Sequence, residues 1–288
     1  MKPLLSFLLV FTFSNLTIAQ TTAIPDANFE QVLINFGLDA ILDGQVLTAN
    51  IDTVTVLNVN SKVITDLTGI EDFSALTYLS CDWNQLTSLN VTQNTALTSL
   101  SCENNQLTNL DLTQNTSLIS FSCGANQLTS LNLTQNSALT TLTCNYNQLT
   151  NLDVTQNTAL TLIYCYNNLL TNLDITQNTS LIYFKCAYNQ LTSLDVTQNI
   201  DLIYFNCFFN PITSLDVTQN ISLYTLECSY NQLANLDLTQ NTALYRLDCN
   251  YNQLTSLDVT NNTTIEILYC TGNQLTNLNT YDILYMVI

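Results

Sequence analysis

The chain has 288 residues and a formal net charge of −18, with four Lys and Arg against 22 Asp and Glu and no histidine. The lack of histidine excludes chemistry that depends on an imidazole base. Nucleic-acid binding requires clustered Lys and Arg to release counterions from phosphates, so we expect no nucleic-acid partner. The same charge excludes electrostatic docking onto anionic membranes.

Residues 1–20 predict a secretory signal peptide. Lys2 precedes an apolar run over residues 4–13, and a polar stretch follows that ends at Ala19 and Gln20. The apolar run is too short to span a bilayer as a permanent helix, and no later segment is continuously apolar for that length. We therefore expect no membrane insertion, and a protein that is exported to the extracellular space or the bacterial cell surface.

Residues 21–53 differ in composition from the rest of the chain and are expected to form an N-terminal cap. Asp26 is a suitable N-cap for a short amphipathic helix from Ala27 to about Phe36. Such a segment would cover the apolar edge of the first coil of a repeat array. Residues 54–75, with Leu57 and Ile64 among their apolar positions, indicate an irregular first repeat.

Residues 76–280 are ten tandem copies of one unit that reads L-x-x-L-x-C-x-x-N-Q-L-T-x-L-D-V-T-Q-N-x-x. One cysteine occurs every 21 residues, at Cys81, Cys102, Cys123, Cys144, Cys165, Cys186, Cys207, Cys228, Cys249 and Cys270. A fixed period of this length predicts a solenoid. A single unit cannot bury its apolar face alone, so the copies must stack.

Two segments in each unit alternate between apolar and polar residues, as in Leu142–Asn145 and Leu152–Thr155. Both patterns predict short strands with one buried face. The unit has no room for a helix of useful length. We therefore expect a mainly β fold, a solenoid with parallel sheets and a short helical cap at its N-terminus.

Each cysteine alternates with polar residues, which favours a column of free thiols that point into the core as small hydrophobic groups. Disulfides between neighbouring coils remain the alternative, because strands about 4.8 Å apart lie within the distance that a disulfide tolerates. Two asparagine columns also recur, Asn84 to Asn273 and Asn94 to Asn262. Their side-chain amides are expected to satisfy backbone groups at the turns.

The units of residues 54–279 resemble leucine-rich repeats of a short, 21-residue form with cysteine in place of the third leucine. The chain is similar to exported leucine-rich-repeat proteins of the Bacteroidetes type and more distantly to internalins, and residues 24–30 resemble their opening segment. The resemblance implies a right-handed solenoid that serves as a secreted or surface binding scaffold, with the cysteine strands on the concave side. It does not identify the partner.

The outward positions beside the cysteines vary while the framework does not, and variation on a fixed scaffold is where specificity resides. These positions are small and polar in the first coils but become large in the middle coils. The candidate partner-binding residues are Leu162, Tyr164, Tyr166, Tyr183, Lys185, Tyr204, Asn206 and Phe208. Such an aromatic patch suits contact with a protein or a sugar ring at a cell surface. The alternative is that these side chains only pack across neighbouring strands and stabilise the sheet. The protein would then be a passive spacer.

Aromatic residues also recur two positions after the cysteine, where recurrence indicates a structural ladder. They are Trp83, Tyr146, Tyr188, Phe209, Tyr230 and Tyr251.

A column of aspartates recurs on the second segment of most units, with Asn90, Asn132 and Asn279 in the same slot elsewhere. Its members in the later coils are Asp153, Asp174, Asp195, Asp216, Asp237 and Asp258. Like charges about 5 Å apart repel, so calcium binding, raised carboxylate pKa values or plain hydration must compensate. An even column singles out no acid and base pair of the kind that a glycosidase needs. We therefore expect no enzyme and no firm cofactor, with calcium as the one candidate.

Residues 281–288 depart from the repeat and end in the apolar run Met286–Ile288. The sequence is compatible with a shortened gene product or with an apolar tail that folds over the last coil.

Overall fold

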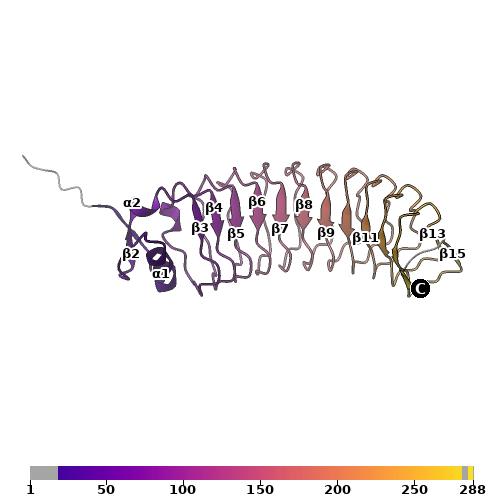
Figure 1. Ribbon diagram of the computed structural model, residues 1–288, viewed down its shortest axis with the longest axis horizontal. Coiled ribbons are helices and arrows are strands. Elements are labelled where there is room, and N and C mark those ends of the chain that lie inside the picture. The colour runs from indigo at the N-terminus through magenta and orange to yellow at the C-terminus, as the bar shows by residue number, and fades with distance from the viewer. Residues whose placement is uncertain (1–18, 281–284, 288) are drawn as a thin grey trace, which may run out of the picture.

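The computed structural model describes residues 19–280 and 285–287. Over these residues the chain winds into an elongated coil, and one strand from each turn lies in a single twelve-stranded sheet (Figure 1). The strands of this sheet are β3 (Val56–Asn58), β4 (Tyr78–Ser80), β5 (Ser99–Ser101), β6 (Ser120–Ser122), β7 (Thr141–Thr143), β8 (Leu162–Tyr164), β9 (Tyr183–Lys185), β10 (Tyr204–Asn206), β11 (Thr225–Glu227), β12 (Arg246–Asp248), β14 (Ile267–Tyr269) and β16 (Tyr285–Val287).

The 21-residue period sets the register of this sheet. Strands β7 and β8 pair in parallel and align Thr141 with Leu162 and Leu142 with Ile163. The middle residue of each repeat strand is buried and its neighbours are mostly part-exposed, as the three residues of β7 show. The predicted mainly β, parallel-sheet solenoid is therefore confirmed.

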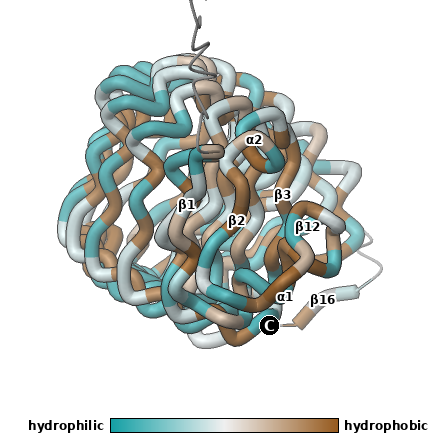
Figure 2. The backbone as a smooth tube through the Cα atoms, turned by 90° about the vertical axis from the view of Figure 1, so that its left-hand side faces the viewer, coloured by the Kyte–Doolittle hydropathy of each residue, from teal (hydrophilic) through white to brown (hydrophobic). Residues whose placement is uncertain are grey.

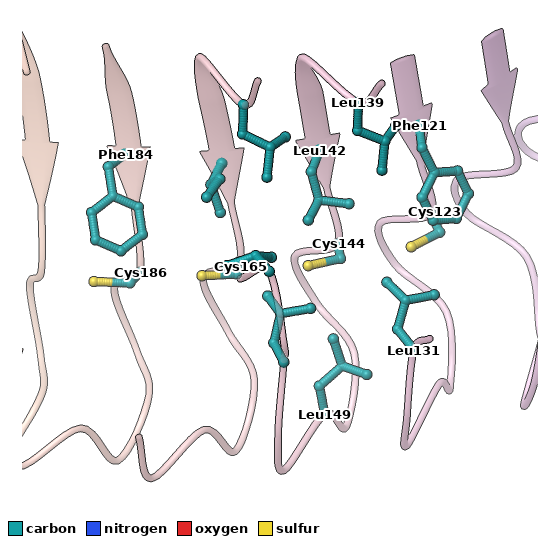
Figure 3. Close-up of a cluster of buried hydrophobic side chains, with 14 of the residues drawn as sticks. Phe121, Cys123, Leu131, Leu139, Leu142, Cys144, Leu149, Cys165, Phe184 and Cys186 are labelled. Atoms are coloured by element: carbon teal, nitrogen blue, oxygen red, sulfur yellow. The ribbon is translucent and has the colours of Figure 1, made fainter. Parts of the chain in front are cut away.

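The core is a stack of similar layers, one from each coil. Leu139, Leu142 and Leu149 are fully buried (Figure 3). The strand register places Leu142 between Phe121 of the preceding coil and Ile163 of the next one. Backbone hydrogen bonds also join the coils outside the strands, as from Gln148 N to Leu128 O (2.8 Å). Each coil thus depends on its two neighbours for both its apolar contacts and its hydrogen bonds.

All ten cysteines are buried free thiols and form a row inside the sheet (Figure 3). Some donate a weak hydrogen bond to the next coil, as Cys102 Sγ does to Ser122 O at 3.6 Å. Burial raises the pKa of every one of these thiols, to about 12 for Cys144 and Cys207. The structure agrees with the stacked thiols favoured by the sequence and not with the disulfide alternative.

The first asparagine column joins adjacent coils through buried amides. Asn147 Nδ2 donates to Cys123 O (3.0 Å) and Cys144 O (3.1 Å), and Asn147 Oδ1 accepts from Leu128 N (2.9 Å). In the second column, Asn157 Nδ2 donates to Leu133 O (3.1 Å) and Asn136 O (2.9 Å). Its Oδ1 has no partner among the described residues. Both columns satisfy backbone groups at the turns, as predicted.

The N-terminal segment packs against the first coil (Figure 2). Phe29 of helix α1 lies with its ring centroid 6.2 Å from that of Phe73. Helix α1 begins after Asp26, as the sequence predicted. The elements of this segment are β1 (Thr21–Ala23), α1 (Ala27–Asn35), β2 (Gln45–Leu47) and α2 (Thr48–Ile51). The 3-10 helix η1 (Ile70–Asp72) belongs to the irregular first repeat.

Asp26 joins this segment to the first coil. Its Oδ1 caps α1 by accepting from Asn28 N (2.9 Å) and Phe29 N (3.0 Å). Its Oδ2 accepts from Thr65 N (2.8 Å), Thr65 Oγ1 (2.7 Å) and Asp66 N (3.2 Å). Burial alone would raise the pKa of Asp26, but these hydrogen bonds outweigh it and lower the pKa from its ordinary value.

We expect Asp26→Ala to lower the free energy of unfolding at pH 7 by about 2 to 4 kcal/mol, because it removes a helix cap and leaves other donors unpaired. A lowered folded-state pKa gives stability that is present above the unfolded value of about 3.9 and lost as the pH falls through the folded value. The deficit of the variant should therefore shrink below pH 4. Guanidinium unfolding at pH 7 and pH 3 measures both effects, with Asp201→Ala as an exposed control. An equal loss of unfolding free energy at both pH values would show that the ionised Asp26 carboxylate is not what stabilises this joint.

The prediction of a second strand in every coil is wrong. The second segment forms strands only in β13 (Ser256–Asp258) and β15 (Asn277–Asn279), which pair with each other. In the earlier coils the aspartate accepts the backbone N–H of the threonine two residues on, as Asp153 does from Thr155. Asp258 of β13 accepts the same hydrogen bond from Thr260 N (3.0 Å), so this bond does not by itself exclude a strand.

The chain ends bear on two further predictions. Residues 1–18 of the predicted signal peptide lie outside the described residues, as do 281–284 and 288. Strand β16 pairs in parallel with β14, with Tyr285 beside Ile267. Residues 285–287 therefore extend the sheet.

Candidate functional site

Most of the predicted site residues lie on one face of the large sheet. They occupy the first and third positions of three adjacent strands, β8, β9 and β10, whose middle residues are buried. The first positions hold Leu162, Tyr183 and Tyr204, and the third positions hold Tyr164, Lys185 and Asn206. We call these six residues the sheet-face patch. Sequence reasoning thus placed six of its eight candidates together.

Lys185 lies between two tyrosine rings in this patch. Its Nζ is 4.7 Å from the ring centroid of Tyr164 and 4.9 Å from that of Tyr204. Both contacts are cation–π interactions, which hold the ammonium over aromatic faces. The single ion pair found among the described residues joins Arg246 to Glu227 (3.4 Å), so Lys185 has no carboxylate partner there.

Glu227 of β11 closes the patch on its C-terminal side. Its Oε2 accepts from Tyr204 Oη (2.7 Å) and from Asn206 Nδ2 (2.6 Å), while Oε1 faces Arg246. Burial and the hydrogen bond to Glu227 raise the pKa of Tyr204 to about 12. The phenol therefore stays protonated at neutral pH and remains a fixed donor, which holds the ring in place beside Lys185.

The other two predicted residues, Tyr166 and Phe208, belong to a different part of the surface. They follow the cysteine, where the chain leaves the sheet and turns. The Tyr166 ring lies 5.3 Å from Tyr146, and the Phe208 ring lies 5.1 Å from Tyr188 and 5.2 Å from Tyr230. We call the rings of Tyr188, Phe208, Phe209, Tyr230 and Tyr251 the corner cluster. Tyr166 and Tyr146 lie outside it, in the two preceding coils. Its aromatic ladder is continuous over these four coils only, because residues 104, 125 and 167 are not aromatic.

The ladder position has left-handed backbone geometry in every coil. Tyr188, Phe209, Tyr230 and Tyr251 have φ values of 51°, 55°, 55° and 49°. Glycine takes this slot at position 272 with φ 68°. A bulky side chain is rare at such a φ, so the corner cluster presents its rings from strained positions.

Sequence reasoning missed a third group of exposed apolar residues, at the start of the middle strands. Ile200 and Ile221 are 54% and 59% exposed, and Ile203 and Tyr224 directly precede β10 and β11. The Tyr224 ring stacks on Tyr245 at 4.9 Å. The signal was present, because most other coils carry Thr or Ser in the slot of Ile200 and Ile221. All three groups lie on the coils that contain residues 160–251.

The aspartate column has a local explanation. Asp153 Oδ1 accepts from Thr155 Oγ1 (2.7 Å) and Thr155 N (3.0 Å). These two hydrogen bonds lower the pKa of Asp153 from its ordinary value. The same threonine contacts and the same lowered pKa recur at Asp111, Asp174, Asp195, Asp216, Asp237 and Asp258. The alternative of raised carboxylate pKa values is therefore wrong. Among residues 19–280 and 285–287, no group of three or more acidic or cysteine side chains is arranged to hold a metal ion.

Comparison with known sequences gives a local match. No family model matches the chain. Over 72 residues, a quarter of the chain, the sequence is 41% identical to Internalin J of Listeria monocytogenes. The matched stretch spans only 8% of that protein's length.

Comparison with solved structures covers nearly the whole chain. The functional domain of InlJ from Listeria monocytogenes, which includes a cysteine ladder, is 33% identical with a TM-score of 0.57, over 91% of this chain and 73% of that one. A leucine-rich-repeat protein of Leptospira interrogans is 23% identical with a TM-score of 0.69, over 79% and 69%. YopM, a leucine-rich effector of Yersinia pestis, is 26% identical with a TM-score of 0.64, over 74% and 60%.

The stacked coils and the sheet-face patch define a leucine-rich-repeat scaffold, a class of fold that suits protein binding. The chain belongs to the internalin-like leucine-rich-repeat proteins. No helix of the described residues is long and apolar enough to cross a membrane.

Proposed function

We propose that this protein is an exported, non-enzymatic scaffold that binds another protein at a cell surface through the sheet-face patch. The observation that carries the proposal is the run of large side chains on β8 to β10, which begins directly after a run of small polar ones. Large outward residues also occur nearer the ends of the sheet, at Val56, Tyr78, Arg246, Ile267 and Tyr269. The coils from β5 to β7 carry only Ser and Thr at the equivalent outward positions. Because those coils keep the same fold, the scaffold does not require the tyrosines.

The chemistry of the patch suits a protein partner. Tyrosine supplies a large contact area at low entropic cost and keeps a polar group at its tip. Tyr204, Asn206 and Lys185 are already held by neighbours, so little side-chain entropy is lost on binding. Ile203 and Tyr224 directly precede β10 and β11 and add exposed apolar surface next to the patch.

Photo-crosslinking tests this proposal directly. A photoreactive amino acid at Tyr183 should capture a partner from host or bacterial surface extracts, whereas the same group at the exposed Gln148 should not. Replacing Tyr164, Tyr183 and Tyr204 with Ser should abolish capture. The matched control replaces Ser99, Ser120 and Thr141 with Ala on the same face of the earlier coils. Equal capture by both variants would contradict the site.

Several finer predictions belong to the same proposal. A glycan on the same face is the second candidate partner, and a glycan array with the tyrosine variant separates it from a protein. Export and kinship to Bacteroidetes-type proteins rest on the sequence pattern of residues 1–30. Calcium bridging of the aspartate column stays a prediction. Calcium that binds the folded protein should raise its melting temperature. No shift in millimolar Ca²⁺ would remove it.

A further inference from the structure

Lys185 lies at the centre of the sheet-face patch and is the one charged residue in it. It occupies the third position of β9, the middle strand of the three, and aligns in register with Tyr164 on one side and Asn206 on the other. Lysine is depleted at protein interfaces, because a strongly hydrated ammonium is costly to bury. Its place at the centre of this patch therefore says something about the partner.

The residues around Lys185 hold its ammonium without giving it an acceptor. The rings of Tyr164 and Tyr204 contact Nζ through cation–π interactions at 4.7 and 4.9 Å. The ammonium carries three N–H donors, and it joins no ion pair among residues 19–280 and 285–287. The rings thus fix the position of the positive charge and leave its hydrogen-bond donors available.

Glu227, the acidic side chain that closes the patch, is already occupied. Its Oε2 accepts from Tyr204 Oη and Asn206 Nδ2, and its Oε1 lies 3.4 Å from Arg246 Nε. The charge of Glu227 is therefore matched by Arg246. The charge of Lys185 is left unmatched, although the chain has 22 Asp and Glu against four Lys and Arg.

Two phenol groups of the patch supply further donors. The hydroxyls of Tyr164 and Tyr183 have no hydrogen-bond partner in the described part of the chain, whereas that of Tyr204 is fixed on Glu227. Burial, and then the neighbouring phenol of Tyr183, raise the pKa of Tyr164, so its hydroxyl keeps its proton at neutral pH. An ammonium accompanied by phenol donors is complementary to a carboxylate, which when ionised only accepts hydrogen bonds.

We propose that the partner protein presents an Asp or Glu carboxylate to Lys185 at the centre of the sheet-face patch. This inference rests on the proposed function, because Lys185 loses its water only if the patch becomes an interface. A buried ammonium without a counter-charge destabilises a complex, and a carboxylate from the partner supplies both the charge and the acceptors. The acid excess of the chain disfavours such a carboxylate elsewhere on the surface, so the contact also fixes where the partner docks.

A library of defined peptides tests this inference without a known partner. Random dodecapeptides displayed on phage are selected on the purified protein, and clones that do not bind the Tyr164, Tyr183 and Tyr204 variant are kept as patch binders. We expect these clones to share an Asp or Glu at one position. Changing that residue to its amide, or Lys185 to Met, should weaken binding at least about tenfold. The two changes together should weaken it little further, because they remove the same contact.

Three variants serve as controls. Lys185→Met keeps an apolar stem between the two rings, so its melting temperature should change little. Lys62→Met makes the same substitution at an exposed lysine outside the sheet and should leave binding unchanged. Lys185→Glu should abolish binding of the acidic clones and should bind the same clones once their acidic residue is replaced with Lys.

The outcomes separate this inference from the proposed function. Patch binders that lack an acidic residue and tolerate Lys185→Met would overturn the carboxylate contact and leave the patch as a binding surface. A selection that yields no clone sensitive to the tyrosine variant would overturn both. Binding of 3′-sialyllactose that is lost in Lys185→Met, without acidic patch binders, would overturn the protein carboxylate in favour of a sugar acid.

Discussion

Replacing Asn147 with Ala is expected to lower the free energy of unfolding by about 3 to 6 kcal/mol. The change removes four hydrogen bonds and leaves Leu128 N buried without an acceptor. Cys123 O and Cys144 O each lose one of two amide donors and keep those of Asn126 and Asn168. An unsatisfied buried backbone group costs about 1 to 3 kcal/mol, and each of the other lost hydrogen bonds costs about 0.5 to 1.5 kcal/mol. Guanidinium unfolding followed by circular dichroism measures the loss.

Two further variants show whether the hydrogen bonds cause this loss. Asn157→Ala should be less destabilising, because the Asn157 amide donates two hydrogen bonds and its oxygen has no partner among the described residues. Gln148→Ala should change the free energy by less than about 0.5 kcal/mol, as is usual for exposed positions. The expected order is therefore Asn147, then Asn157, then Gln148. Equal losses at Asn147 and Gln148 would show that the amide column does not join the coils.

All ten cysteines are expected to be unreactive toward thiol reagents in the folded protein and to become reactive together when it unfolds. Burial raises the pKa of Cys144 from 9.0 to about 12. Since the thiolate is the nucleophile, a shift of about three pKa units lowers its population at pH 8 roughly a thousandfold. Labelling with Ellman's reagent should therefore proceed at the rate of unfolding in buffer and within seconds in 6 M guanidinium.

An added exposed thiol calibrates the experiment. Gln148→Cys places a sulfhydryl four residues from Cys144 in sequence but on the surface, and this single thiol should react at once. Rapid labelling of the native protein without the added cysteine would contradict the buried column. Fewer than ten thiols in guanidinium would show that disulfides form between coils after all.

The repeat period carries most of the fold. A 21-residue spacing without insertions forces each strand to pair with the next in one register, so Leu142 meets Ile163 and every cysteine meets a cysteine. The asparagine columns were predictable for the same reason, because one polar residue at a buried turn recurs in every coil. Helix α1 was predictable from the capping preference of Asp26.

The second strand of each coil was not predictable from alternation alone. Asp153 and Val154 alternate as a strand would, but only β13 and β15 form a second ladder, although Asp258 of β13 makes the same hydrogen bond to its threonine as Asp153 does. Periodicity reports which side chains are buried, and it does not report where the backbone hydrogen bonds go.

The candidate site was predictable in part. Six outward residues of β8 to β10 follow directly from alternation beside the cysteines. Tyr166 and Phe208 were assigned to the same face, but the chain turns after the cysteine and carries them to the corner. The left-handed geometry there opposes the preferences of tyrosine and phenylalanine, although glycine at position 272 in the same slot was a usable sign.

The uniform register has a consequence for the evolution of the molecule. Because each coil meets its neighbours through the same contacts, removing residues 97–117 would join Ala96 to Leu118 with an unchanged interface on either side. The operation would shorten the distance between helix α1 and the tyrosines of β8 by one strand spacing, about 4.8 Å. Duplication would lengthen it by the same step. The number of coils therefore sets the distance between helix α1 and the sheet-face patch in steps of one strand spacing. Unequal recombination is able to change that distance without altering the chemistry of the patch.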